Sequence, residues 1–262
     1  MIILYVLLCI ALLAVLITVH EFGHFIVAKK IGCQVNEFAI GMGPKLWSKQ
    51  YGETKYSLRA IPIGGFCDIE GEAQVTYKEG SPRLICNKPA WQQLAVFLAG
   101  VTMNFIFGFV FIFLGYCIKA TYSGWGLADI WASTVNLYGV SITAVFTALY
   151  QLFTGTLSGS DVGGVVGAVN QISSAAAASN DSIALIFALM GSISVNLALM
   201  NLLPLPCLDG GRCLLIILNK AKLWITKKPL SEKFQEKSIQ ATMVLILALT
   251  MVLLVKDVFD II

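Results

Sequence analysis

Charged residues are scarce in this chain: Asp, Glu, Lys and Arg together make up 13% of its 262 residues, whereas hydrophobic residues make up 57%. A soluble domain usually has roughly 25% charged and 45 to 50% apolar residues, so the composition excludes one and indicates an integral membrane protein. The sequence also lacks an internal repeat, a phosphate-binding loop and a stacking platform for bases. Its formal net charge of +3 is small, and we predict no nucleic acid partner.

Four apolar stretches are long enough, or nearly so, to cross the hydrocarbon core, which takes about 20 residues. They are 2–28, 93–118, 183–203 and 239–255. The first lacks the basic amino-terminal region and small-residue cleavage site of a signal peptide, so we expect it to be retained. The chain is therefore predicted to be an α-helical membrane protein of about four transmembrane helices, with residues 1–262 forming a single domain.

The basic residues predict the orientation, because cytoplasmic loops carry an excess of Lys and Arg. Most of the 18 Lys and Arg residues fall between the first and second spans or between the third and fourth. The connection 119–182 has a single Lys and is predicted to be extracytoplasmic, as are both termini. The stretch 137–153 is apolar enough to be taken for a further transmembrane span. Because a crossing there would invert the third span, we interpret it as an interfacial or partly inserted helix.

Histidine is rarer still, and both of the two histidines lie in the first apolar stretch, in His20-Glu21-Phe22-Gly23-His24. Histidines four residues apart share one face of a helix and can hold one zinc ion, while Glu21 can act as a general base on water. A pair of buried polar residues serving helix packing is the alternative. Ionisable groups inside a membrane segment are costly, roughly 2.5 to 3.5 kcal/mol each, which favours the metal site.

A third ligand is expected in the segment 201–211, at the end of the third span, where Asp209 is the only acid. Pro204 and Pro206 break the helix, and irregular backbone at membrane depth must line a cavity or be buried in protein. An ordinary helix cap and turn would have a similar sequence. The predicted topology favours Asp209 as a metal ligand over a helix cap, because the third span ends on the same side of the membrane as His20 and His24.

The seven cysteines are odd in number and scattered, with five in loops or loop borders assigned to the cytoplasm. A disulfide framework is therefore not expected. Cys207 is close to Asp209 in sequence and could be a ligand, but a small apolar filler is the favoured interpretation.

The two motifs together resemble those of the site-2 proteases, the zinc metalloproteases that cleave within the membrane. The likeness rests on His20 to His24 and on the pattern Asn-x-x-Pro-x-Pro-x-Leu-Asp-Gly of residues 201–210. Further likeness to the bacterial branch that regulates sigma-E is found in four segments: Gly41 to Leu46, Ile61 to Phe66, Ala99 to Phe105, and Leu157 to Gly159.

The resemblance implies an endopeptidase with Zn²⁺ as cofactor, held by His20, His24 and Asp209, with Glu21 as the catalytic residue. It also implies a bacterial inner membrane location, substrates that are transmembrane helices, and an active site toward the cytoplasm. Asn201 would bond the substrate backbone. Further substrate contacts are expected at residues of the resembling segments: Gly43, Gly65 and Asn104. For Asn104, the residue type alone favours packing between helices.

The region 34–69 contains short strands punctuated by Gly43-Pro44, Tyr51-Gly52 and Gly64-Gly65. From the residues alone, a cytoplasmic loop with turns is favoured. The resemblance implies a re-entrant β-hairpin layer between the first and second spans, which clamps the substrate as an added strand. The sigma-E-regulating branch usually carries PDZ domains between the second and third core helices. The connection 119–182 is too short for one, so we expect no PDZ domain here.

Two other functions fit the same residues. A non-proteolytic metal-binding membrane scaffold or carrier would use the same ligands, although zinc binding alone needs no acid between the histidines. A membrane-anchored peptidase could also act on soluble peptides outside the bilayer. The sequence predicts neither the substrate nor the oligomeric state.

Overall fold

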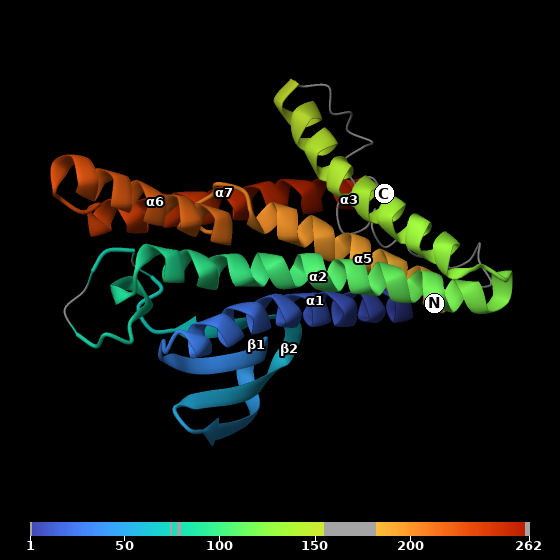
Figure 1. Cartoon of the computed structure of the whole chain (residues 1–262), viewed down its shortest axis with the longest axis horizontal. Helices are drawn as coiled ribbons and strands as arrows, with labels where there is room; N and C mark the ends of the chain where they lie inside the picture. Colours follow the sequence, from blue (N-terminus) through green and yellow to red (C-terminus); the bar gives the residue numbers. More distant parts are fainter. Residues whose placement is uncertain (1, 74, 78–79, 155–181, 260–262) are drawn as a thin grey trace. The chain divides into compact units, whose positions relative to one another are not determined.

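The computed structural model describes residues 2–73, 75–77, 80–154 and 182–259, and most of them are helical (Figure 1). The elements in chain order are α1 (Ile2–Lys30), β1 (Val35–Tyr51), β2 (Thr54–Ile69), η1 (Ile85–Asn87), α2 (Ala90–Ser123), α3 (Leu127–Thr154), α5 (Ser182–Asn201), α6 (Asp209–Thr226) and α7 (Glu232–Phe259). The prediction of a mainly helical protein with strands between its first two long helices is confirmed.

Four helices are long and apolar enough to cross a membrane within the described residues: Ile10–Lys30, Ala90–Ser123, Leu127–Gln151 and Ile183–Asn201. Three of them correspond to the first three predicted spans. The helix Leu127–Gln151 overlaps the stretch 137–153, and its interfacial placement stays a prediction. The fourth predicted span, 239–255, lies inside α7, and its crossing likewise stays a prediction. The segment 155–181, with the motif Leu157 to Gly159, lies outside the described residues.

The chain divides into two compact units. The described parts of one unit lie within Met1–Cys9, Asn104–Met200 and Ile246–Ile262, and those of the other lie within Ile10–Met103 and Asn201–Leu245. The second unit holds most of α1, the sheet, the start of α2, and α6. It also contains every residue of the site described below.

Glycines let α2 and α5 approach closely in the first unit. A side-chain carbon at Gly108 would lie 2.7 Å from Val195, and one at Gly115 would lie 2.7 Å from the Ala184 carbonyl oxygen. Small residues serve this purpose in membrane helix pairs. Gly108 and Gly115 therefore allow the two helices to pack at close range.

β1 and β2 form a two-stranded antiparallel sheet whose long strands fold back on themselves. The stretch from Glu37 to Ile40 pairs with Lys55–Leu58 and also with Gly65–Asp68, and Trp47 to Gln50 returns to pair with Lys55–Leu58. The last stretch of β2 therefore has one side paired with β1. Figure 1 shows the sheet lying against the carboxyl-terminal part of α1, where Phe25 packs on Phe38 and Tyr56.

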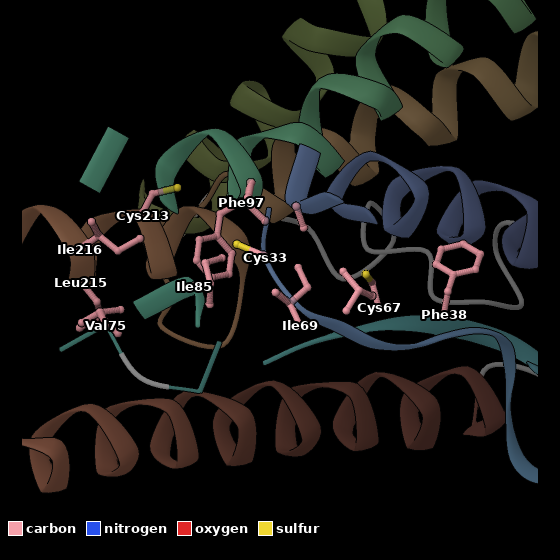
Figure 2. Packing of buried hydrophobic residues seen from close by; sticks show 13 residues of the cluster. Cys33, Phe38, Cys67, Ile69, Val75, Ile85, Phe97, Cys213, Leu215 and Ile216 are labelled. Carbon is pink, nitrogen blue, oxygen red and sulfur yellow. The ribbon is translucent and has the colours of Figure 1, made fainter. Parts of the chain in front are cut away.

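A cluster of buried apolar residues ties the sheet to the helices of the second unit. Figure 2 shows it running from Phe38 and Cys67 of the sheet to Leu215 and Ile216 of α6. Val96 of α2 belongs to the same cluster and has no exposed surface. Because close-packed side chains resist displacement, this cluster holds α1, α2, α6 and the sheet in a fixed arrangement around the site.

Candidate active site

The helical repeat of α1 brings both histidines to one face. His20 and His24 are buried, with 7% of each exposed. Their Nε2 atoms are 3.1 Å apart, and the two rings meet edge to face with centroids 4.7 Å apart. The spacing of four residues therefore directs two nitrogen atoms to a common point, as the sequence predicted.

Asp209 supplies an oxygen atom at that point. Its Oδ2 atom lies 2.9 Å from His20 Nε2 and 3.3 Å from His24 Nε2. Burial opposes ionisation of the Asp209 carboxyl, but its contacts with His20 and His24 outweigh burial and lower its pKa to about 2. The carboxyl group is thus ionised at neutral pH, as a metal ligand must be.

The glycines after Asp209 explain how α6 can begin at this point. Leu205 and Leu208 form backbone turns, donating to the carbonyl oxygens of Leu203 and Leu205. A side-chain carbon at Gly210 would collide with the carbonyl of Leu202, and one at Gly211 would collide with that of Leu205. Only residues without a side chain therefore allow the first turn of α6 to pack on the proline-containing loop.

The donor set fits a tetrahedral metal ion. The three ligand atoms of His20, His24 and Asp209 lie within 4.8 Å of one another. His24 Nδ1 lies 2.8 Å from the carbonyl oxygen of Val96 and donates to it, which leaves Nε2 as the ring atom that would bind a metal ion. With both Nε2 atoms deprotonated, their lone pairs and the Asp209 carboxylate would point to one cation. Three protein ligands with one open position are typical of a catalytic zinc site.

Gly100 of α2 makes room for the histidine pair. A side-chain carbon at this position would collide with the His24 ring and would lie 2.8 Å from His20 Cε1. In the sequence, Gly100 indicates only that helices can approach closely at this position. Its role at the metal-ligand cluster was missed because a glycine in a hydrophobic helix looks the same whether it faces another helix or an imidazole.

Glu21 is held beside the ligands by the sheet. The backbone N–H of Cys67 in β2 donates to Glu21 Oε2 over 3.0 Å. Both residues line a cavity of about 190 Å³ that contains the three ligands, together with Phe66, Ile69, Glu72, Phe97, Cys207, Leu208 and Arg212. The cavity thus brings together an acid, three metal-binding side chains and the strand β2. These are the groups needed to hydrolyse a peptide bond.

Two further charged residues of the cavity wall were not singled out from the sequence. Burial, partly offset by the charge of Arg212, raises the pKa of Glu72 to about 7. The Arg212 guanidinium donates to the carbonyl oxygens of Glu72 and Ala73, which ties α6 to the chain after β2. In the sequence, the only signal for Glu72 and Arg212 is that each is an ionisable residue close to an apolar segment.

The remaining predicted site residues lie elsewhere, and their substrate contacts stay predictions. Gly65 belongs to the same stretch of β2 as Cys67 and pairs with Ile40. Gly43 has a left-handed backbone with φ of 80°, and its carbonyl accepts a hydrogen bond from Arg59. Asn201 ends α5 and is half-buried.

Asn104 is fully buried in the first unit, where its carbonyl oxygen accepts a hydrogen bond from Ser194. Cys207 lines the cavity, although the metal-binding cluster consists of the two histidines and Asp209. The six cysteines whose side chains are described are free thiols.

Comparison with known proteins finds relatives whose names describe them as zinc metalloproteases. Zinc metalloprotease Rip1 of Mycolicibacterium smegmatis is 38% identical over 135 residues, which cover 48% of this chain and 32% of the relative. "Putative zinc metalloprotease all3971" of Nostoc sp. is 27% identical over 350 residues, covering 96% of this chain and 95% of the relative. A protein of similar designation from Clostridium perfringens is 27% identical over 340 residues, covering 97% and 98%.

The chain thus aligns with about a third of Rip1 but with nearly the whole of the other two relatives. Those two alignments are longer than the 262 residues of this chain, so both relatives contain residues without a counterpart here. The family profile described as Peptidase family M50 matches residues 8–249. The resemblance to the site-2 proteases is thereby confirmed, and the chain belongs to Peptidase family M50.

Proposed function

We propose that this chain is a zinc-dependent intramembrane endopeptidase that hydrolyses peptide bonds in the transmembrane segments of other proteins. The observation that carries the proposal is that His20, Glu21 and His24 lie on a helix long and apolar enough to span a membrane, where Asp209 of α6 converges with the two histidines. An enzyme that cuts soluble proteins has no need to place its metal ligands within such a helix. The family and the names of the relatives support zinc as the metal.

Each residue of the site has a role in hydrolysis. His20, His24 and Asp209 would hold zinc, which when bound lowers the pKa of water toward about 7 and polarises a carbonyl group. Glu21 takes the proton from the attacking water and returns it to the leaving amine. The carbonyl of Val96 fixes the ring of His24 by accepting from Nδ1.

The substrate needs to be unwound before it can be cut, because the carbonyls of a helix are hydrogen-bonded within the helix. The stretch of β2 from Gly65 to Ile69 pairs on one side with β1, while the N–H of Cys67 points to Glu21. An extended substrate added to this edge would exchange its helical hydrogen bonds for strand hydrogen bonds. Its backbone would then lie beside the ligands and the base.

The decisive assay combines purified protein, zinc and a single-span membrane substrate in proteoliposomes. The variant Glu21→Gln is expected to bind zinc as the wild type does and to cleave at least about 1,000-fold more slowly, because the general base is gone. Glu236→Gln, at an exposed site of α7, is the matched control and should cleave normally. If Glu21→Gln cleaves as fast as wild type, the proposal is wrong.

The same assay separates the alternative functions. A metal-binding scaffold or carrier would bind zinc stoichiometrically and cut no transmembrane substrate. A peptidase of soluble peptides would cut those peptides and leave the membrane substrate intact. The natural substrates can then be found by mass spectrometry of cells with the wild type against cells with Glu21→Gln, as membrane stubs that accumulate in the variant.

We further propose that both termini face outward in a bacterial inner membrane and that the site lies toward the cytoplasm. The excess of Lys and Arg in the loop that contains the sheet supports this orientation. A membrane-impermeant maleimide should label Gly124→Cys, between α2 and α3, in intact cells. It should leave Lys49→Cys, on the exposed part of β1, unlabelled until the cells are opened. The reverse pattern would contradict this topology.

A further inference from the structure

One backbone group reaches the acid of the cavity from the sheet. The N–H of Cys67 donates to Glu21 Oε2 over 3.0 Å, although the two residues are 46 positions apart in sequence. Glu21 lies directly after His20 on α1, so a contact that fixes its carboxylate also fixes the distance between that carboxylate and the metal-ligand cluster. Hydrogen bonds to an ionised acceptor are shorter and roughly twice as strong as those between neutral groups.

The donor is itself held rigidly. Cys67 pairs with Phe38 across the sheet, and the residue is buried within the apolar cluster of Figure 2, with 6% exposed. Burial raises the pKa of the Cys67 thiol, which keeps it protonated and without the charge of a metal ligand. The side chain therefore anchors the strand in the core, while the backbone N–H faces the acid.

We propose that the backbone amide of Cys67 is the positioning group that holds the Glu21 carboxylate in its working orientation. This inference rests on the proposed function, in which Glu21 is the general base. A glutamate side chain has several rotamers, and a base must lie within hydrogen-bond reach of the proton that it takes. A donor fixed by the sheet selects one of those rotamers before the substrate arrives, which is preorganisation.

The same contact sets the register of an added substrate strand. The N–H groups of alternate residues in a strand point to the same edge of the sheet. The N–H of Gly65 therefore points to the same edge as the N–H of Cys67. Gly65 can then bond the substrate, whereas the amide of Cys67 is taken by Glu21. The substrate carbonyl opposite Cys67 is left without a partner from the sheet and lies beside the base.

The test removes the N–H and leaves the rest of the strand. Cys67→Pro lacks the donor, and proline is tolerated in an edge strand whose N–H points away from its partner. The reference is Cys67→Ala, which keeps the N–H. Relative to Cys67→Ala, Cys67→Pro is expected to have kcat lower by roughly 10- to 100-fold, the value of one hydrogen bond to a charged group. KM and zinc content should change less than about 2-fold, because neither depends on the orientation of Glu21.

A second pair of variants guards against misfolding of the proline variant. Lactic acid introduced at position 67 by in vitro translation replaces the alanine N–H with an ester oxygen and adds no steric change. Its kcat should fall by the same factor against Cys67→Ala. Equal kcat values for ester and amide, with Glu21→Gln inactive, would overturn the inference and leave the proposed function standing. A higher KM with unchanged kcat would also overturn it, because the amide would then serve substrate binding.

Discussion

The Nδ1 atom of His24, on α1, lies 2.8 Å from the carbonyl oxygen of Val96, on α2. A backbone carbonyl thereby fixes both the tautomer and the ring plane of a predicted metal ligand, which is how histidine ligands are commonly oriented. Val96 has no exposed surface, so this acceptor moves only if the core is repacked. One turn further along α2, Gly100 faces the rings of His20 and His24.

This packing predicts a strong effect of the smallest substitution at Gly100. Gly100→Ala places a methyl group against the two rings and should push His24 away from Val96. Zinc affinity is expected to fall by roughly 10- to 100-fold, as it does when an orienting group of a metal ligand is lost, and can be measured by competition with a chelating dye. Gly139→Ala is the matched control, because its added carbon would meet open space. Equal zinc affinities of the two variants would contradict this packing role.

Asp209→Asn tests the third ligand with almost no change in size. The amide is a far weaker zinc ligand than the ionised carboxylate, so the protein should lose most of its zinc on dialysis against a mild chelator. Asp129→Asn, at the exposed start of α3, is a control that should retain zinc. Metal content measured by mass spectrometry provides the readout. Full retention of zinc in Asp209→Asn would exclude this carboxylate from the site.

Metal removal should destabilise the second unit, because its ligands come from α1 and α6. A ligand that binds only the folded state stabilises it by RT ln(1 + [L]/Kd), about 4 kcal/mol at a thousand times Kd. Thermal unfolding in detergent is therefore expected at a lower temperature after chelation and to recover on addition of zinc. Asp209→Asn should show little response to either treatment. An unfolding temperature independent of zinc in the wild type would contradict a bridging metal site.

The sheet should lose stability in acid through Glu37. Burial alone would raise the pKa of this carboxyl, but hydrogen bonds from Ser57, Arg59 and Lys45 outweigh burial and lower it to about 2. Since the folded pKa is below the unfolded value of 4.5, the stabilisation is complete above pH 4.5 and is lost as the pH falls toward 2. Allowing for solvent screening, its size is on the order of 1 kcal/mol.

Denaturation of wild type and Glu37→Gln at several pH values checks this prediction. The difference in unfolding free energy between the two proteins should be largest near pH 6 and should shrink between pH 4.5 and 2, because the variant lacks the titrating group. A difference that stays constant over that range would show that Glu37 does not contribute in its charged form.

Residue composition and local periodicity alone determined a large part of this protein. Long apolar stretches predict helices because a chain in lipid needs to satisfy its backbone hydrogen bonds internally. The helical repeat likewise places His20 and His24 on one face, whatever the rest of the chain does. Asp209 was predicted from its place after two prolines and from the side on which the third span ends. In each case the signal lies in residue type and spacing.

Only the tertiary structure decided what surrounds these residues. Every residue carries a backbone carbonyl, and every residue other than proline carries an N–H, so no residue type marks Val96 and Cys67 as partners of His24 and Glu21. Gly100 is distinguished from other helix glycines only by the imidazole rings that it faces. These contacts join residues from 46 to 80 positions apart, and they form because the shared apolar core of α1, α2, α6 and the sheet brings those segments together.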